Sequence, residues 1–584
     1  MCNNDKYVTI FIKNMDKSIN VPKNSNLGLT LSKEIGFPLP CGGNGFCGKC
    51  LVKIVEGEVT PPTSLEILRG YSDIRGYRLA CQVKVLGNVL LEIPYIPWER
   101  PITTRIGLEI PLKEVHPLIN LIRVDASMTP KDANLRSFII YDEALKRLIE
   151  SSNEVYALGL DGIVYLVKSL KKPTVCLVDL GTSKIALHVM DYYNSKLMKE
   201  DVIINPQIRI GTDIMSRLAS IITGRTSTKE LKNMVLNAIE DEIRRIVGKD
   251  GLKDIVLIAI AGNSVMTSII LEEPVITLAQ KPFQPLTLSM FMTLSNRFGF
   301  REINDSIVLV MPLLGGFVGG DALMDYIAVS YMESKDRYLI VDLGINTELI
   351  LVNKDEVYFT SSPAGPAFEG HITSGVHDPY GAVSEVTIES ISDKKISFRW
   401  KTVDGEKPRG LIASGAISVL YELLTHNIID YSGKLLRYNV IDGNKGLCII
   451  PANQTLHGKP IIITQHDIRE LQKAIAAVKT AWKVLLNYVN MDIDELDRVY
   501  IAGTFGTSLN PKHAKELGIV PPVDINKIVP SGNLVLQGLK ISIFDSKYLK
   551  GVLNRTCNFR FVNLVEYPDF NKLWIENLRL DKIF

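Results

Sequence analysis

"TVCLVDLGTSKIALHVMD", residues 174–191, joins two strand-like runs through a short turn that carries an acid and a glycine. Runs of this length, rich in β-branched residues and bounded by a glycine turn, predict a β-hairpin. Residues 337–355, "RYLIVDLGINTELILVNKD", repeat the strand, the tetrapeptide V-D-L-G and the second strand. The chain therefore contains the same hairpin twice, which indicates an internal duplication.

A second pair of matching segments follows the two hairpins. Residues 255–264, "IVLIAIAGNS", come after the first hairpin, and residues 498–506, "RVYIAGTFG", come after the second. Each reads as a buried strand that ends in I-A-G. The repeated order of hairpin, strand and glycine turn predicts two related α/β lobes that face a cleft.

The turns of the two hairpins are candidate phosphate sites. A glycine lets a turn present N–H groups to phosphate oxygens, and Asp179 and Asp342 are placed to orient Mg²⁺ through its water shell. An ordinary tight turn is the competing interpretation, because D-x-G is common in hairpins. Two copies in parallel contexts favour phosphate binding. The candidate contacts are Gly181, Thr182, Ser183, Gly344, Asn346 and Thr347.

The doubled DLG and the late "AGTFG" resemble the phosphate-1, phosphate-2 and adenosine motifs of the actin, Hsp70 and sugar-kinase ATPase superfamily. The resemblance implies a duplicated, RNase H-like, two-lobed ATPase-type domain over residues 173–584, with catalytic roles for Asp179 and Asp342. It also implies that Gly503, Thr504 and Gly506 contact the nucleotide. Residues 311–324, "MPLLGGFVGGDALM", resemble the connecting helix of that superfamily, whose glycines allow two helices to cross closely.

The motifs depart from the superfamily pattern at a few positions. Ile345 stands where a hydroxyl often follows the glycine, and Thr504 and Thr507 replace the expected alanine and amide or acid. The segment "GHITSGV" is also divergent. These changes affect fast hydrolysis more than nucleotide binding.

Residues 41–50, "CGGNGFCGKC", bring together three of the eight cysteines. Cys41, Cys47 and Cys50 are spaced C-x5-C-x2-C, and Cys81 supplies a fourth sulfur. In a reducing cytoplasm such a set favours a metal site over disulfides. Zinc is the alternative, but zinc sites usually combine two short cysteine pairs, whereas three ligands in one loop and a distant fourth are typical of a [2Fe-2S] cluster.

The surroundings of this loop indicate a small α+β domain. Residues 7–12 and 51–54 are strand-like, residues 27–36 form a short helix, and residues 77–93 read as closing strands with Cys81 inside one of them. The arrangement resembles the β-grasp [2Fe-2S] ferredoxin, here over residues 1–93, and the x5 spacing resembles the adrenodoxin-like variant.

A proline-rich stretch, "PYIPWERP", begins at residue 94 and favours an extended linker over residues 94–104. Residues 105–172 then contain an amphipathic stretch at 141–150 and strand-like runs at 155–160 and 162–170. They carry no reactive cluster. We expect a small α/β middle domain that serves packing or docking.

The bulk composition sets limits on the function. A chain of 584 residues with 46% hydrophobic and 22% charged residues is expected to be a multidomain α/β and α+β protein. A formal charge of +2 gives no reason to expect a nucleic-acid partner. Residues 255–271 carry no charge but read as a strand turning into a helix, so no membrane segment is expected. The N-terminus lacks a secretory pattern, and we expect a cytoplasmic protein.

With the ferredoxin-like part in front, nearly the whole chain resembles the reductive activators of corrinoid-dependent methyltransferases. Further matching stretches are residues 205–217, 364–370, 413–420, 464–479 and 518–522. The resemblance implies an ATP-dependent enzyme with ATPase activity that transfers one electron from a [2Fe-2S] cluster to a Co(II) corrinoid and regenerates Co(I). It implies ATP with Mg²⁺ as cofactor, a corrinoid protein and an upstream low-potential electron donor as partners, and it allows a homodimer.

Two alternatives stay open at this point. The chain could be an iron–sulfur electron-transfer and docking protein whose ATPase-like part is a non-hydrolysing scaffold. It could also be a ferredoxin-fused small-molecule kinase, although the sequence offers no base that would activate a hydroxyl.

Overall fold

The computed structural model describes most of the chain, and the statements below concern the residues it describes. These are residues 6–35, 37, 39, 45, 50–68, 76–93, 107–124, 155–160, 163–211, 213–281, 283–376, 379–392, 395–441, 444–503 and 506–581. Cys41, Cys47, Thr504, the expected linker at 94–104 and the amphipathic stretch at 141–150 lie outside them.

The N-terminal part is a five-stranded mixed sheet of order β2-β1-β5-β3-β4. β1 pairs antiparallel with β2 and parallel with β5, and β3 lies between β5 and β4. The apolar side of helix α1 packs on this sheet through Leu27 and Leu31, which are fully buried. The β-grasp arrangement expected from the sequence is therefore confirmed. The elements are β1 (Tyr7–Ile12), β2 (Lys17–Pro22), α1 (Leu27–Ile35), β3 (Leu51–Val59), α2 (Ser64–Leu68), β4 (Tyr77–Leu79) and β5 (Val85–Glu92).

Cys81 does not lie within a strand, which corrects the sequence interpretation. It lies in η2 (Ala80–Gln82), a 3₁₀ turn between β4 and β5. The reason is topological: β4 and β5 flank β3 on opposite sides, so the chain must leave the sheet and cross over between them. The turn holds the Cys81 side chain at the edge of the sheet and keeps it buried.

The duplicated pattern appears as two six-stranded sheets that share a five-stranded core. The first has the order β11-β10-β9-β12-β14-β13 and the second the order β26-β17-β16-β15-β24-β25. β11-β10-β9-β12-β14 corresponds to β17-β16-β15-β24-β25, while β13 and β26 extend opposite edges. In each sheet a predicted hairpin pairs with the later I-A-G strand in parallel, β9 with β12 and β15 with β24. The strands are β9 (Thr174–Leu180), β10 (Lys184–Asp191), β11 (Leu197–Ile204), β12 (Ile255–Gly262), β13 (Phe291–Leu294), β14 (Ile307–Val310), β15 (Arg337–Asp342), β16 (Thr347–Asn353), β17 (Glu356–Ser362), β24 (Arg498–Ala502), β25 (Ile528–Gly532) and β26 (Phe559–Phe561).

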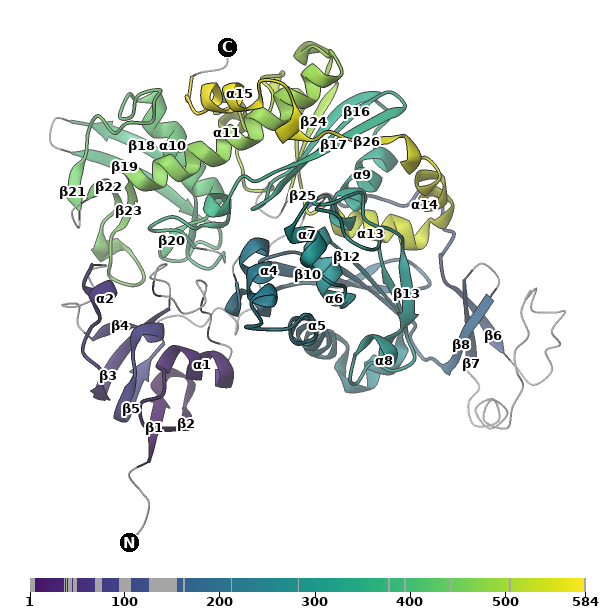
Figure 1. Cartoon of the computed structure of the whole chain (residues 1–584), viewed down its shortest axis with the longest axis horizontal. Helices are drawn as coiled ribbons and strands as arrows, with labels where there is room; N and C mark the ends of the chain where they lie inside the picture. Colours follow the sequence, from purple (N-terminus) through teal and green to yellow (C-terminus); the bar gives the residue numbers. More distant parts are fainter. Residues whose placement is uncertain are drawn as a thin grey trace, which may run out of the picture.

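The two sheets share a helical layer (Figure 1). Alternate residues of β9 face opposite sides, so Val175 and Leu177 join the core around α9 (Gly320–Met332) and α13 (Val535–Phe544). Cys176 and Val178 instead face α5 (Thr228–Gly251) and α6 (Ser264–Ile270). The second sheet packs its other face on α10 (Ala413–Thr425) and α11 (Gln465–Tyr488).

The close crossing of α9 and α13 depends on Gly538 and not on the glycines of residues 311–324. α9 begins only at Gly320, so Gly315, Gly316 and Gly319 precede it in a loop. A Cβ at Gly538 would lie 2.0 Å from the carbonyl oxygen of Met324 in α9. The expected close helix crossing exists, but its small residue comes from α13.

Residues 107–124 connect the N-terminal part to the first sheet. The Leu108 N–H donates to Ser531 O (3.0 Å) and the Leu118 N–H to Ile543 O (2.7 Å), so this segment packs beside α13. β6 (Asn120–Val124), β7 (Val155–Leu160) and β8 (Ile163–Ser169) form a separate three-stranded sheet. The strands expected at 155–160 and 162–170 are thus confirmed.

The other elements complete the periphery. They are η1 (Lys13–Met15), η4 (Pro206–Arg209), α4 (Ile214–Ile222), η5 (Leu252–Asp254), α7 (Ile276–Ala279), α8 (Ser295–Phe298), η6 (Pro366–Glu369), β18 (Ala382–Ile391), β19 (Ile396–Thr402), β20 (Gly410–Leu411), β21 (Asn439–Ile441), β22 (Asn444–Ile450), η7 (Ala452–Gln454), β23 (Ile461–Thr464), η8 (Ile493–Glu495), α12 (Pro511–Glu516), η9 (Ile525–Lys527), α14 (Ser546–Leu553), η10 (Thr556–Asn558), η11 (Leu564–Glu566) and α15 (Phe570–Asn577). Among the described residues, no helix combines the length and apolar composition needed to cross a bilayer.

Candidate functional site

Two of the four predicted cluster ligands are described, and they lie together. Cys50 precedes β3, Cys81 lies in η2, and both side chains are buried. Their sulfur atoms are 3.2 Å apart, beyond the ~2.05 Å of a disulfide and near the roughly 3.7 Å expected for two thiolates on one tetrahedral metal with ~2.3 Å bonds. The separation of the two sulfurs therefore fits two ligands of the same iron ion in a [2Fe-2S] cluster.

The backbone around Cys81 is tightly packed. A Cβ at Gly28 would lie 2.7 Å from the Cys81 backbone nitrogen, and a Cβ at Gly45 would lie 2.8 Å from Nε2 of Gln82. Gly45 also has φ +77°, which favours glycine. Gly45 of the cysteine loop thus adopts a backbone conformation that favours glycine, while its close neighbour is the flexible end of the Gln82 side chain.

A buried ion pair fixes the strand that leads to Cys81. The Arg78 Nε and Nη2 atoms donate to the two carboxylate oxygens of Glu66 at 2.9 and 3.0 Å, and the Leu79 N–H donates to Glu66 at 3.0 Å. Burial alone would raise the Glu66 pKa, but hydrogen bonds from Arg78, Thr63 and Leu79 lower it. Glu66 therefore stays ionised and ties α2 to β4.

The acidic residues of the two hairpins occupy matching positions. Asp179 of β9 pairs with Ala261 of β12, and Asp342 of β15 pairs with Ala502 of β24. The neighbouring glycine turns also match. A Cβ at Gly262 would lie 2.7 Å from Leu180 O, and a Cβ at Gly503, which has φ +92°, would lie 2.6 Å from Leu343 O and 2.8 Å from Asp342 Oδ1.

The hairpin turns themselves leave room only for glycine. A Cβ at Gly181 would lie 2.7 Å from Lys184 O, and a Cβ at Gly344 would lie 2.9 Å from Asn346 O. The structure therefore shows a steric reason for each turn glycine. Gly506 is equally crowded, with backbone carbonyl oxygens 2.8 and 2.9 Å from a Cβ placed there.

The hydroxyl and amide candidates differ in their contacts. Thr182 Oγ1 accepts a hydrogen bond from Asn263 Nδ2 (3.1 Å), and the Ser183 hydroxyl donates to Glu369. Thr347 is fully buried and its hydroxyl donates to Gly344 O (3.4 Å), so it supports its own turn. Asn346 lies in that turn and is partly exposed.

Asp179 and Asp342 belong to a larger group of carboxyl groups. Burial raises the pKa of Asp179 to about 8, helped by the charges of Asp321 and Asp342, while a 2.5 Å hydrogen bond from Asn533 opposes the rise. Burial also raises the pKa of Asp321 to about 7 and that of Asp342 to about 6. These groups resist simultaneous ionisation unless a cation accompanies them.

Asp325 is a further, fully buried member of this group of carboxyls. Its two carboxyl oxygens are buried and receive no hydrogen bond from the described residues. Burial, and then the charge of Asp342, raise its pKa well above the ordinary value. Burial raises the Glu348 pKa in the same way, with further contributions from Asp321 and Asp342. Asp325 adjoins the Asp342 carboxyl group, with which it can share a proton. Such a group of buried carboxyls fits a bound divalent cation and its water shell.

Sequence reasoning missed several residues of this site. Asp321 and Asp325 lie on α9, one helical turn apart, inside and just after the quoted residues 311–324. That spacing was the available signal, because two acids on one face of an apolar helix are unusual. Asn533 and Glu369 come from distant segments; Glu369 lies in the matching stretch 364–370 but was not assigned a role, and nothing local in the sequence marks Asn533.

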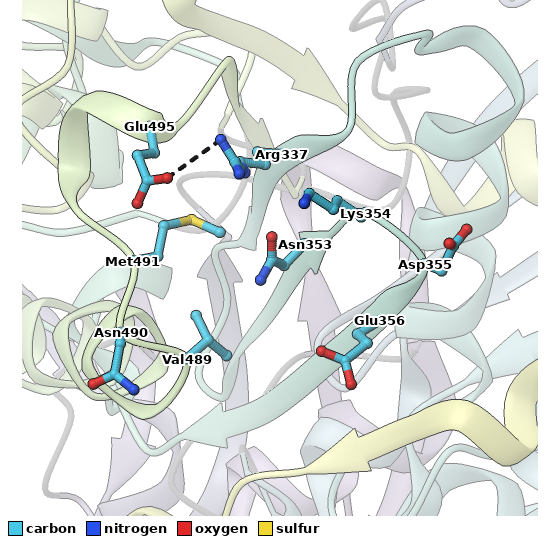
Figure 2. Close-up of a pocket in the computed structure, with 9 residues that line it drawn as sticks. All are labelled: Arg337, Asn353, Lys354, Asp355, Glu356, Val489, Asn490, Met491 and Glu495. Atoms are coloured by element: carbon cyan, nitrogen blue, oxygen red, sulfur yellow. Dashed lines mark ion pairs between the residues drawn. The ribbon is translucent and has the colours of Figure 1, made fainter.

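A pocket of about 440 Å³ lies at the opposite end of the second hairpin (Figure 2). Arg337 begins β15 and Asn353 ends β16, whereas Asp342 is at the far end of β15. The Arg337 guanidinium pairs with Glu495 at 3.3 Å across this pocket. The pocket is therefore separate from the group of carboxyls around Asp179 and Asp342 and lies outside the site described above.

Three protein-family models match the chain in sequence order. A 2Fe-2S iron-sulfur cluster binding domain matches residues 10–86, the RACo middle region matches residues 175–335, and the C-terminal domain of RACo, the ASKHA domain, matches residues 336–583. The boundary between the last two falls just before β15, so each RACo model contains one of the two hairpins.

Individual proteins show the same combination. The corrinoid activation enzyme RamQ of Eubacterium limosum is 27% identical over 598 residues, which cover 96% of this chain and 97% of RamQ. The [Co(II) methylated amine-specific corrinoid protein] reductase of Methanosarcina barkeri is 24% identical over 64% of this chain and 71% of that protein. The solved structure of a reductive activator for corrinoid, iron-sulfur protein has a TM-score of 0.72, with 26% identity and 98% coverage of both chains.

The fold and site define an iron–sulfur protein in which a [2Fe-2S] ferredoxin domain is joined to a duplicated ASKHA-type domain. The whole-length matches narrow that class. The chain belongs to the family of reductive activators of corrinoid proteins.

Proposed function

We propose that the protein is an ATP-dependent reductive activator that returns the Co(II) corrinoid of a methyltransferase system to Co(I). The observation that carries the proposal is the joining, in one chain, of the Cys50–Cys81 pair and the paired hairpin site. Relatives named as a corrinoid activation enzyme and a corrinoid protein reductase match along most of the chain.

We assign Cys41, Cys47, Cys50 and Cys81 as the ligands of the [2Fe-2S] cluster. When bound, a cluster of this type supplies one electron at a reduction potential of about −400 mV. The chain contributes a buried pair of thiolates, a loop glycine with positive φ, and the Glu66–Arg78 pair that holds β4 in place. Cys50 and Cys81 are themselves buried, which limits the access of water to their sulfurs.

We assign the space between the hairpin turns to ATP with Mg²⁺. Asp179 and Asp342 would hold the hydrated cation, with Asp321 and Asp325 beside them. The turn glycines and hydroxyls would contact the phosphates, and the segment from Gly503 through Thr504 to Gly506 would contact the adenosine. The raised pKa values of the aspartates support this assignment, because a bound cation would favour their ionised forms.

The need for ATP follows from the redox potential. Reduction of a corrinoid to Co(I) takes place at very low potential, and each ~59 mV of shortfall costs tenfold in the equilibrium of a one-electron step. Nucleotide binding and hydrolysis would change how the two lobes close and how the corrinoid protein docks, so that electron transfer runs one way. The partners are then a corrinoid protein and an upstream low-potential donor, and residues 94–104 would act as the spacer.

A scaffold that binds nucleotide without hydrolysis is the second candidate. Two observations favour it: Ile345 occupies the place of a hydroxyl, and the Thr347 hydroxyl is engaged with Gly344 O. Both features remove groups that could position water at the second turn.

One assay separates these functions. The protein with its cluster is mixed anaerobically with a low-potential reductant and a Co(II) corrinoid protein, and Co(I) is followed by absorbance with and without MgATP. We expect Co(I) to form only with MgATP. In a Cys81→Ser variant we expect no Co(I) to form. ATP-independent Co(I) formation would support the scaffold, and no Co(I) under either condition would refute the reductive function.

A further inference from the structure

Glu369 is a charged residue in contact with both hairpin turns. It ends η6, the segment that follows β17 and begins after Gly365. The Gly365 N–H donates to the Ile345 carbonyl oxygen at 2.9 Å, and Gly365 has φ +83°. The segment that carries Glu369 is therefore attached to the second turn by its own backbone.

The Glu369 carboxylate faces one turn of each sheet. The Ser183 hydroxyl of the first turn donates a hydrogen bond to it, and the backbone of Ile345 in the second turn lies close enough to favour the ionised form of Glu369. Burial raises the pKa of this carboxyl group, and the cations of Lys184 and Arg217 oppose the rise. Arg217 itself is fully buried and donates from Nη2 to Thr182 O at 2.6 Å.

These are the donors that a phosphate group would be expected to use. A turn hydroxyl, a turn amide and nearby cations make an anion position, and here a carboxylate of the same chain occupies it. The first sheet has a comparable 3₁₀ segment, η4, after β11, and its last residue is a cation, Arg209. The acid at the matching place in η6 is thus not required by the repeated fold.

We propose that Glu369 is a gate residue whose carboxylate occupies the anion position between the two turns until the β- and γ-phosphates of the nucleotide displace it. The inference rests on the proposed binding of ATP at these turns. A carboxylate and a phosphate cannot share the Ser183 and Ile345 donors, because their like charges repel. Nucleotide arrival therefore breaks the Ser183–Glu369 hydrogen bond, which joins a turn of the first sheet to a segment of the second.

The gate makes a directional prediction about affinity. Replacing Glu369→Gln keeps the size of the side chain but removes its charge, so the phosphates displace a weaker occupant. We expect the Kd of the full-length protein for the Mg²⁺ complex of adenylyl imidodiphosphate, measured by isothermal titration calorimetry, to fall about tenfold, or ~1.4 kcal/mol. Adenosine monophosphate lacks the displacing phosphates, and its Kd should not change.

The control is Glu385→Gln, an exposed acid on β18 that lies away from both turns. Its Kd values should equal those of the unaltered protein. Equal or weaker binding of the triphosphate analogue by Glu369→Gln would overturn the gate, as would equal tightening toward the monophosphate. If binding were unchanged and ATP hydrolysis fell steeply, Glu369 would be a water-positioning base and not a gate. If the unaltered protein bound no nucleotide, the proposed function itself would fail.

Discussion

The Arg78–Glu66 pair shows how one buried charge depends on another. Glu66 is fully buried, and Arg78 is its cationic partner through two hydrogen bonds. Arg78→Met would leave a buried carboxylate without its counter-ion, at a cost of about 3–5 kcal/mol. We expect the visible absorbance of the cluster to be lost at a lower temperature in this variant.

The double variant Arg78→Met with Glu66→Met is the matched control. It replaces both charges with apolar side chains and should recover most of the lost stability. If the single variant keeps its cluster as well as the unaltered protein, the ion pair does not hold β4 and Cys81 in place.

The carboxyl groups of the proposed nucleotide site make the stability depend on pH. The pKa values of Asp342, Asp321 and Asp179 are raised to about 6, 7 and 8, above their ordinary value of 3.8. The folded protein then holds more protons than the unfolded chain between about pH 4 and pH 8, so its stability falls as pH rises through this range. Without nucleotide or Mg²⁺, we expect the Tm to be about 2–4 °C lower at pH 8 than at pH 6.

Asp179→Asn tests the origin of this dependence. The amide keeps the shape of the side chain beside Asn533 but cannot ionise, so the fall in Tm between pH 6 and pH 8 should shrink. Millimolar Mg²⁺ should likewise reduce the fall in Tm of the unaltered protein between pH 6 and pH 8. A Tm that rises across this range would contradict the account.

At the scale of elements, the hairpins were predictable and the helix crossing was not. The repeated V-D-L-G and the alternating apolar residues identified β9–β10 and β15–β16, and the I-A-G echo identified their parallel neighbours. Gly538 could not be found in this way, because the sequence around a glycine in an apolar helix does not show which other backbone packs against it.

The crossing of α9 and α13 can be tested at that glycine. Gly538→Ala places a methyl group 2.0 Å from Met324 O, so the helices must separate. Overpacking of this kind costs about 1–3 kcal/mol, and we expect a lower Tm and weaker nucleotide binding. Gly551→Ala in α14 is the matched control, because its Cβ meets nothing within 4 Å. Equal Tm values for the two variants would refute the close crossing.

The functional site was only partly predictable for a related physical reason. Asp179 and Asp342 could be found because each lies at or next to the end of a recognisable strand. Asn533 becomes important through burial and through contacts between distant segments, which leave no local pattern. Asp325 is marked only by its spacing from Asp321 on an apolar helix, and Glu369 only by its place in the matching stretch 364–370. Cys81 was predicted to be a ligand, but its 3₁₀ turn follows from the strand order and not from its neighbours.

At the scale of the whole molecule, the ferredoxin domain lies beside the part of the chain that carries β21–β23 (Figure 1). The Lys459 ammonium lies 5.7 Å from the centre of the Tyr77 ring of β4, within the range of a cation–π contact. Tyr77 and Lys459 are both half-buried, and a cation–π contact contributes about 0.5–2 kcal/mol, so this contact alone does not fix the ferredoxin domain against its neighbour.

A single-turnover measurement tests the coupling of the two sites most directly. Protein with a reduced cluster is mixed with a Co(II) corrinoid protein in a stopped-flow instrument, and cluster oxidation and Co(I) formation are recorded together. With MgATP, we predict that both signals change at the same rate with one Co(I) formed per cluster oxidised, and that neither changes without ATP or in Asp342→Asn. Equally fast transfer without ATP, or ATP hydrolysis with no cluster oxidation, would contradict the account.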